Sequence, residues 1–302
     1  MKLLISILGP TSIGKTKITI NLAKYFNTEK ISCDSRQFYR EINIGTSSPT
    51  IKELNKIKHH FIGHLSILDD YNIYRYENDA IKKLKKLFKI YNIIFMVGGS
   101  FLYEKAVIEG INYIPKINNK KLLIYRNKLY KKSINYLINK VKKKDFLFFK
   151  KYLKNKKDKR KIIRALEIKH FTKKKISFFY KLKKNKRPFN KYIRIGIIDK
   201  RENIYNNINN KVDIMIKKGL FYEAKNLYKY RKLNSLNTIG YKEIFNFFKK
   251  KYNKKICIYK IKKNTRNYAK RQIIWLRKIQ NIKLFTPNKI KKIKKLIIKN
   301  LK

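Results

Sequence analysis

Residues 2–16 read KLLISILGPTSIGKT, and this stretch decides the fold. Residues 2–8 form a short, nearly continuous apolar run, which is typical of a strand buried on both faces of a parallel sheet. Residues 9–16 fit the pattern G-x-x-x-x-G-K-[ST] of a phosphate-binding loop, which stands between a strand and a helix. Helical spacing follows at residues 15–25. We therefore predict an α/β fold whose core is a P-loop NTPase-like parallel sheet.

Each part of this loop suits a bound phosphate. Glycines let successive backbone N–H groups point at phosphate oxygens, and the following helix adds the positive end of its dipole. Lys15 supplies a cation for the terminal phosphate, and the Thr16 hydroxyl is the expected ligand for Mg²⁺. Such loops are typical of nucleotide- and ATP-binding proteins, but the pattern does not distinguish a diphosphate from a triphosphate. The expected phosphate-binding residues are Gly9, Pro10, Thr11, Ser12, Ile13, Gly14, Lys15 and Thr16.

The rest of the chain continues this alternation and then departs from it. Further strands are expected at residues 30–33, 93–97 and 192–198. A helix is expected at residues 79–89. After residue 198 the chain is expected to be helical throughout. The expected helices there are 203–218, 221–230, 242–250 and 264–279, and a frayed amphipathic helix at 288–302. Residues 116–190 are lysine-rich with helical spacing, so we expect a mostly helical insertion there, and 181–191 as the returning linker. The expected domains are residues 1–115 with 191–302, and residues 116–190.

The charge is extreme. The 302 residues include 79 Lys and Arg against 18 Asp and Glu, a net charge of +61. Such a surface attracts polyanions, with binding that weakens as salt rises. A codon bias toward A and T explains the same abundance of Lys, Asn, Ile, Tyr and Phe equally well. Charge alone therefore does not identify a nucleic-acid partner.

Composition also excludes several classes of protein. At 43% hydrophobic residues the chain can bury a core, which argues against intrinsic disorder. Two Cys without close spacing exclude a disulfide scaffold and a Cys-based zinc site. No apolar run approaches the ~20 residues that span a bilayer, and the first segment is expected to be a strand rather than a signal peptide. We expect a soluble, cytoplasmic protein.

The positions of acidic residues near the expected strand ends argue against simple ATP hydrolysis. A hydrolysing NTPase usually has a metal-binding Asp at the end of a further apolar strand. Here the strand expected at 93–97 is followed by Gly98, Gly99 and Ser100, and the acid at a strand end in this half is Asp34. This pattern leaves room for a site where a diphosphate is bound and displaced, with Asp34 in another role.

Eight segments, in order over about 270 residues, resemble motifs of the tRNA dimethylallyltransferases, also called tRNA isopentenyltransferases. They are GPTSIGKT at 9–16, DSRQFY at 34–39, IGT at 44–46 with Pro49, HH at 59–60, VGGSFLY at 97–103, RALE at 164–167, IGYKE at 239–243, and TRNYAKRQ at 265–272 with WLR at 275–277. The chain departs from the family at Lys211, where an Arg that contacts the diphosphate is usual; Lys keeps the charge but loses the bidentate fork. It ends without the zinc finger of eukaryotic relatives, so we expect the bacterial type.

The resemblance implies transfer of a dimethylallyl group from its diphosphate to N6 of the adenosine 3′ of the anticodon, position 37 of tRNA. Lys15, Thr16 with Mg²⁺, and Lys211 would stabilise the leaving diphosphate. Asp34 is the expected general base for the amine proton, and the implied catalytic residues are Asp34, Lys15 and Thr16. The residues expected to contact tRNA are Asp34, Ser35, Arg36, Gln37, Ser100, Arg160, Lys161, Arg164, Lys242, Arg266, Lys270 and Arg277. We expect a monomer that does not bind membranes.

Other interpretations remain open at this point. Asp34 can instead cap a helix or bind metal, residues 34–37 can be an ordinary turn, and Arg266, Lys270 and Arg277, which share a helix face by spacing, can be a solvated basic face. The whole chain can be a P-loop nucleotide or small-molecule kinase, an isopentenyltransferase acting on free AMP, or a non-catalytic RNA-binding protein. The histidines at 59, 60 and 64 lack a partner at metal-ligand spacing, so we do not expect zinc.

Overall fold

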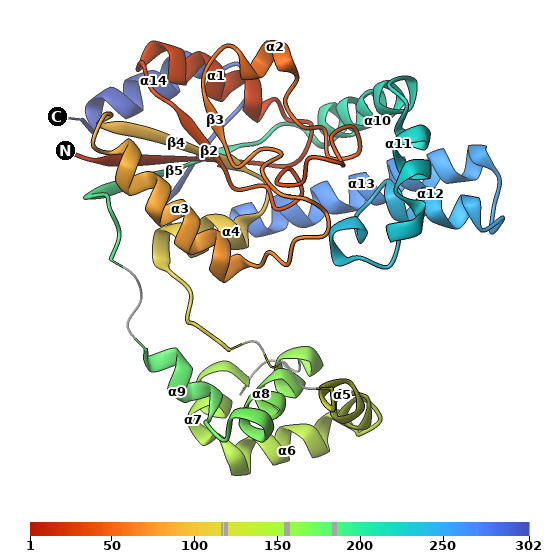
Figure 1. The fold of residues 1–302 in the computed structure, drawn as a ribbon. Coiled ribbons are helices and arrows are strands. Elements are labelled where there is room, and N and C mark those ends of the chain that lie inside the picture. Colours follow the sequence, from red (N-terminus) through yellow and green to blue (C-terminus); the bar gives the residue numbers. More distant parts are fainter. Residues whose placement is uncertain (116, 118–119, 154–157, 183–185, 302) are drawn as a thin grey trace. The chain divides into compact units, whose positions relative to one another are not determined.

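The structure is a computed structural model that describes residues 1–115, 117, 120–153, 158–182 and 186–301. The chain divides into two compact units, Met1–Glu109 with Arg187–Lys302, and Gly110–Lys186 (Figure 1). Residue 116, where the insertion is expected to begin, and residues 183–185 of the expected linker lie outside the described residues.

The larger unit is built on a six-stranded sheet whose pairs are all parallel, in the order β3-β2-β4-β1-β5-β6. Every residue of β1 and β4 is buried, as their apolar runs predict. The predicted parallel α/β core is confirmed. The strands are β1 (Leu3–Leu8), β2 (Lys30–Ser32), β3 (His59–His60), β4 (Ile93–Gly98), β5 (Lys191–Ile197) and β6 (Ile282–Phe285).

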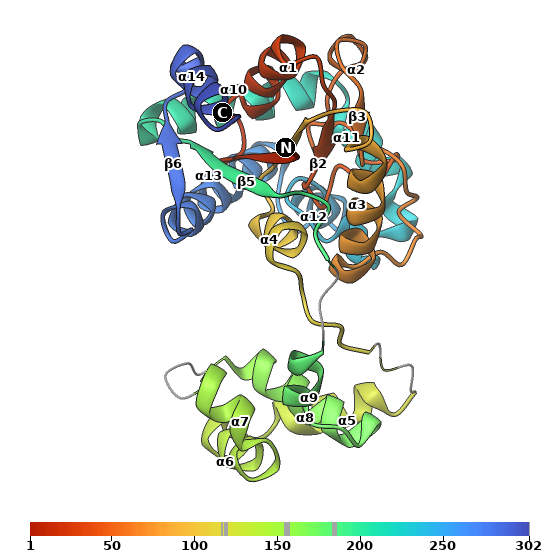
Figure 2. The ribbon, with the colours of Figure 1, turned by 90° about the vertical axis from the view of Figure 1, so that its left-hand side faces the viewer.

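Helices cover both faces of this sheet (Figures 1 and 2). Helices α1 (Lys15–Tyr25) and α14 (Ile290–Lys299) pack on one face, and α3 (Ile73–Leu87) and α4 (Phe101–Glu109) pack on the other. Side chains alternate along β1, so Leu4 and Leu8 join one core and Leu3, Ile5 and Ile7 the other. The remaining elements are α2 (Ile51–Leu54), α10 (Arg201–Lys217), α11 (Leu220–Asn226), α12 (Tyr241–Phe248), α13 (Lys254–Arg277), and 3₁₀ turns at Tyr228–Tyr230 and Asn234–Leu236.

The smaller unit, Gly110–Lys186, is helical in its described part and has its own core. Leu137, Ile162 and Ile168 in that core are completely buried. Its elements are α5 (Leu122–Tyr130), α6 (Ile134–Lys144), α7 (Phe146–Phe148), a π-helical turn at Phe149–Leu153, α8 (Lys159–Thr172) and α9 (Ile176–Lys181).

The structure differs from the sequence prediction at several elements, among them the strand β3 and the helices α2 and α4, where no element was expected. Helices α3 and α13 begin earlier than expected, after Asn72 and Asn253, because the Asn72 side chain accepts hydrogen bonds from two backbone N–H groups of the first turn and the Asn253 side chain accepts one. The expectation of helix throughout after residue 198 is wrong at β6, whose segment IKLF is short and pairs with β5 at the sheet edge. Short edge strands have little sequence signal of their own.

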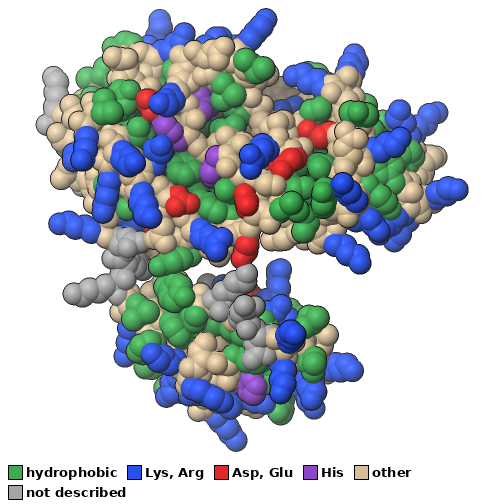
Figure 3. All heavy atoms as spheres, viewed as in Figure 1, with side chains coloured by type: hydrophobic (Ala, Val, Ile, Leu, Met, Phe, Trp, Pro, Cys, Tyr) green, Lys and Arg blue, Asp and Glu red, His purple; other side chains and the backbone are tan. Residues whose placement is uncertain are grey.

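Lys and Arg side chains project from all over the face shown in Figure 3, and the fewer acidic side chains on this face lie among them on the larger unit. No helix in the described ranges is long and apolar enough to cross a membrane.

One lysine departs from this surface pattern. Lys30 in β2 is 4% exposed, and burial lowers its pKa to about 7.

We expect Lys30→Met to raise the unfolding free energy by a few kcal/mol at pH 6, because burial disfavours the charged form. The gain should shrink as the pH rises from 7 toward 10.5, since the folded protein then loses this proton before the unfolded chain does. Chemical denaturation at pH 6 and pH 9.5 measures this gain in unfolding free energy. The control is Lys82→Met, at an exposed site on α3. An equal effect of both variants would contradict this expectation.

Candidate active site

A cavity of ≈ 1650 Å³ lies in the larger unit, where the segments after β1, β2 and β4 come together. Parallel neighbouring strands end at the same edge of a sheet, and ligands bind outside these carboxyl ends. Much of the lining comes from residues 11–17, 34–37, 43–51 and 97–99, from α10 and α13, and from residues 237–240 with Lys242.

The phosphate-binding loop has the backbone that its sequence requires. Ser12 and Gly14 have positive φ values of 63° and 87°, so the chain turns sharply before α1. A side chain at Gly9 would place its Cβ 2.6 Å from the Ile197 carbonyl oxygen. No side chain of the described residues caps the start of α1, and its first turn contains no acid. The N–H groups of this turn are therefore available to an anion.

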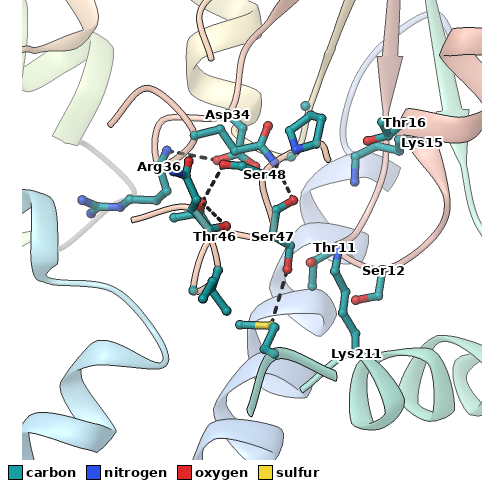
Figure 4. A pocket seen from close by; sticks show the side chains of 18 of the residues that line it. Thr11, Ser12, Lys15, Thr16, Asp34, Arg36, Thr46, Ser47, Ser48 and Lys211 are labelled. Carbon is teal, nitrogen blue, oxygen red and sulfur yellow. Dashed lines mark hydrogen bonds between the residues drawn. The ribbon is translucent and has the colours of Figure 1, made fainter. Parts of the chain in front are cut away.

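Two lysines face this loop. The Lys15 ammonium donates a hydrogen bond to the Pro10 carbonyl at 2.7 Å. Burial lowers the pKa of Lys15 to about 8; the Asp34 charge opposes this shift and the Lys211 charge adds to it. Burial likewise lowers the pKa of Lys211, against the effect of Asp34. Figure 4 shows Lys211 reaching from α10 toward Thr11 and Ser12. The two cations therefore favour a bound anion.

Asp34 lines the same cavity at the end of β2. Its carboxylate accepts a hydrogen bond from the Arg36 backbone N–H at 3.1 Å, and its own N–H donates to the Ser32 hydroxyl at 3.2 Å. Ser35 is bound to Ser100, since its N–H donates to the Ser100 hydroxyl at 3.2 Å and the two hydroxyls lie 3.3 Å apart. Asp34 thus combines a fixed backbone with a carboxylate facing the cavity.

Arg36 and Gln37 are both engaged with other segments of the protein. The Arg36 guanidinium donates to the Asn234 and Ser235 carbonyls at 2.9 and 3.0 Å. The Gln37 amide donates to the Ser47 carbonyl at 3.3 Å. Arg36 therefore ties the Asp34 segment to the loop before α12, which the motif alone does not indicate.

The chain itself offers a divalent cation few ligands. No group of three or more His, Cys, Asp and Glu among the described residues could hold a metal ion. Thr16 and Asp34 carry oxygens on the cavity wall, the donor type that Mg²⁺ prefers. Mg²⁺ usually keeps several waters and binds one or two protein oxygens together with substrate phosphates. These residues therefore fit Mg²⁺ that arrives with a phosphate-bearing ligand.

The other expected cations of the larger unit differ in exposure. Lys242, Lys270 and Arg277 are exposed, and Lys242 also lines the cavity. Arg266 is half-buried and donates to the Asn209 side chain at 2.7 Å. All but Lys242 lie on α13, so the predicted basic stretch is helical.

In the smaller unit, the predicted contacts lie on α8. Arg160 and Lys161 are exposed in its first turn, after Asp158, which caps the helix. Arg164 instead lies 3.3 Å from the carboxylate of Glu167, which is 1% exposed, and donates to the Pro115 carbonyl at 3.1 Å. Arg164 therefore stabilises this unit internally, whatever else it binds.

Sequence reasoning missed Gln272. Its side chain on α13 is 4% exposed and accepts from the Thr11 N–H at 2.9 Å while donating to the Gly99 carbonyl at 3.0 Å. It thus joins the phosphate-binding loop to the end of β4. The available signal was a polar residue three positions after the buried Ala269, on the apolar face of the helix.

The adjacent histidines stabilise structure. His60 Nε2 lies 2.5 Å from Glu29, and His59 Nδ1 lies 2.8 Å from the Ile57 carbonyl. Burial lowers the pKa of His59 to about 4, so it is neutral at pH 7.

Comparisons with known proteins agree on one family. The family model described as IPP transferase matches residues 37–279, more than half of the chain. The chain is 46% identical to a tRNA dimethylallyltransferase of Christiangramia forsetii, over 93% of this chain and 92% of the relative. It is 42% identical to tRNA dimethylallyltransferase 2 of Azobacteroides pseudotrichonymphae, over 96% of this chain and 94% of the relative.

Solved structures give the same result. A full-length tRNA isopentenylpyrophosphate transferase from Bacillus halodurans is similar with a TM-score of 0.74 and 31% identity, covering 100% of this chain and 97% of that one. A eukaryotic dimethylallyltransferase acting on tRNA gives a TM-score of 0.78 and 28% identity, covering 95% of this chain and 74% of that one.

The lowered pKa of Lys15 predicts how anion binding depends on pH. Inorganic diphosphate should bind the free protein progressively more weakly as the pH rises through about 8, because Lys15 then loses its proton. In Lys15→Arg the fall should become smaller, since a guanidinium stays charged while Lys211 still titrates. Calorimetric titrations from pH 6.5 to 9 measure this, and the ionisation of diphosphate itself affects both proteins equally. Identical pH profiles for the two proteins would contradict the assignment.

Proposed function

This chain belongs to the IPP transferase family, and on that premise we propose that it transfers a dimethylallyl group from dimethylallyl diphosphate to N6 of adenosine 37 in tRNA, releasing diphosphate. The observation that carries the proposal is the single cavity onto which Lys15, Lys211 and Asp34 all open. The leaving diphosphate needs positive charge beside it, and the amine needs a negatively charged group to accept its proton. This cavity offers both charges.

The reaction breaks the bond between the allylic carbon and the diphosphate oxygen and forms a bond from that carbon to N6. The electron pair of the broken bond leaves with the diphosphate. Lys15, Lys211 and the N–H groups at the start of α1 would stabilise the charge that develops there. Bound at Thr16 with the diphosphate, Mg²⁺ would supply further Lewis-acid stabilisation of the leaving group.

Asp34 is the proposed general base. The exocyclic amine of adenine is a weak nucleophile and becomes acidic as its bond to carbon forms, so a carboxylate beside it can take the proton. The hydrogen bond from the Arg36 N–H and the anchored Asp34 N–H support a fixed orientation for this carboxylate.

The acceptor base must leave its stack in the anticodon loop to reach Asp34, which costs a few kcal/mol. We propose that Ser35, Gln37 and Ser100 contact the extruded adenosine, because they surround Asp34. Arg36 would act mainly through its contacts with the loop at Asn234 and Ser235.

The tRNA backbone would contact exposed cations of both units. On the larger unit these are Lys242, Lys270 and Arg277, with Arg266 partly committed to Asn209. On the smaller unit they are Arg160 and Lys161, with Arg164 in a supporting role. Residues 1–115 with 191–302 would thus be the catalytic core, and 116–190 a tRNA-contacting insertion. The monomeric state and the cytoplasmic location expected from the sequence remain predictions.

The decisive experiment incubates the purified protein with dimethylallyl diphosphate, Mg²⁺ and unmodified tRNA, followed by mass spectrometry of the nucleosides. Prenylated adenosine at position 37 is the expected product. Prenylated AMP in place of prenylated tRNA, or phosphate transfer from labelled ATP, would favour the alternative enzyme classes. Binding of tRNA without diphosphate release would indicate a non-catalytic RNA-binding protein.

Asp34→Asn tests the general base. The amide oxygen can still accept from the Arg36 N–H, so the turn should persist while turnover falls by about 10²–10⁴-fold. Rates under single-turnover conditions and tRNA binding should be measured at pH 7, because loss of the Asp34 charge lowers the pKa of Lys15 further. Near-normal turnover with intact tRNA binding would refute the role of Asp34.

A further inference from the structure

One wall of the cavity is an irregular loop, residues 43–48, between β2 and α2. Figure 4 shows Thr46, Ser47 and Ser48 of this loop near Asp34, with Lys15 and Thr16 on another side of the cavity. The loop contains only turns, with the Ser47 N–H donating to the Ile44 carbonyl and the Ser48 N–H to the Asn43 carbonyl, both at 3.0 Å. A loop of this kind needs an anchor from elsewhere to hold one shape.

Glu223 on α11 provides that anchor, 178 and 179 residues away along the chain. One carboxylate oxygen accepts from the Ile44 N–H at 2.9 Å, and the other from the Gly45 N–H at 3.0 Å. The second oxygen also accepts from the Tyr241 hydroxyl at 2.5 Å. Hydrogen bonds to a charged acceptor are roughly twice as strong as neutral ones.

Tyr241 completes the anchor. Its side chain is fully buried, and burial together with the Glu223 charge raises its pKa, so the hydroxyl stays protonated and donates. The Tyr241 ring also lies directly against Gly45, where a Cβ would be only 2.5 Å from the ring's hydroxyl oxygen. Gly45 is therefore required for the loop to reach Glu223.

The anchored loop holds the Asp34 segment in turn. The Ser47 carbonyl accepts from the Gln37 side-chain amide at 3.3 Å, and Gln37 lies three residues from Asp34. The Ser32 hydroxyl lies 3.5 Å from the Gln37 amide oxygen, so both ends of this amide face a partner. The orientation of Gln37 thus depends on where Ser47 is held.

We propose that Glu223 is a positioning residue, which fixes the loop 43–48 and, through Ser47 and Gln37, the part of the cavity that receives the adenine. This inference rests on the proposed function. Lys15 and Lys211 face the loop 9–16, in the part of the cavity proposed to bind the diphosphate. Glu223 makes none of the contacts described there. Its loss should therefore affect the acceptor and spare the diphosphate.

Glu223→Gln is the direct test, because it keeps the shape and removes the charge. The amide has one accepting oxygen, so its NH₂ group must face a backbone N–H donor and one loop contact is lost. We expect the KM for tRNA to rise at least 10-fold, while the Kd for inorganic diphosphate stays within about 2-fold of the wild type. Amide hydrogen exchange across residues 42–49 should speed up in the same variant.

Two matched variants separate positioning from general stability. Tyr241→Phe leaves both backbone contacts of Glu223 in place, so we expect a KM change below about 3-fold. Glu243→Gln alters a different carboxylate, which is buried and accepts from the Gly240 N–H at 2.8 Å and from Asn264 at 2.7 Å without contacting the loop. It should lower stability and leave the KM for tRNA unchanged.

The outcomes are distinguishable from failure of the proposed function. If the wild-type protein prenylates tRNA and Glu223→Gln keeps a normal KM, the positioning role is refuted while the function stands. An equal rise in KM for Glu243→Gln would also refute it, because stability alone would then explain the effect. If the wild-type protein transfers no prenyl group, the proposed function is wrong, and the acceptor role of Glu223 falls with it. Unchanged hydrogen exchange at residues 42–49 would refute the anchor itself.

Discussion

The parallel pairing of β1 with β4 on one side and β5 on the other is the constraint on which the site depends. It brings the loop after β1 beside Gly98 and Gly99 at the end of β4, and the pairing of β4 with β2 adds the segment after β2 at the same edge of the sheet. Space at this edge is so limited that a Cβ at Gly98 would lie 2.6 Å from the Cys33 sulfur. Segments far apart in sequence can share a small cavity only because their strands end side by side.

Charge in this protein works at two scales. The net charge of +61 spreads over the surface and provides long-range attraction for a polyanion without choosing where it binds. The few carboxylates act locally instead. Glu167 holds Arg164, Glu104 holds Arg194, and Glu223 holds backbone amides of the cavity wall. Specific geometry here therefore comes from the acids as much as from the lysines.

Residues of the recognisable motifs have two kinds of role. Lys15 and Asp34 face the cavity, as expected of residues that touch a ligand. Arg36 and Gln272 belong to motifs as well, but their side chains bind other parts of the protein. Motif membership marks a residue as important without saying whether it meets the substrate or holds a residue that does. The roles assigned to individual residues remain predictions.

The sequence by itself determined the parallel α/β core, the phosphate-binding loop and the family, because these depend on local pattern: apolar strands, fixed glycine spacing and ordered motifs. It did not reveal the strand β6, the inward orientation of Arg164, or the contact of Glu223 with Ile44 and Gly45. The strand β6 and the Glu223 contact depend on which distant segments meet, and a carboxylate that binds backbone N–H groups leaves no signature in the sequence of the loop it holds. The orientation of Arg164 depends instead on how the smaller unit folds, which places Arg164 beside Glu167 and the Pro115 carbonyl. Tertiary structure alone decided the Glu223 contact, since its hydrogen bonds span more than 170 residues and form only when folding has brought their partners together.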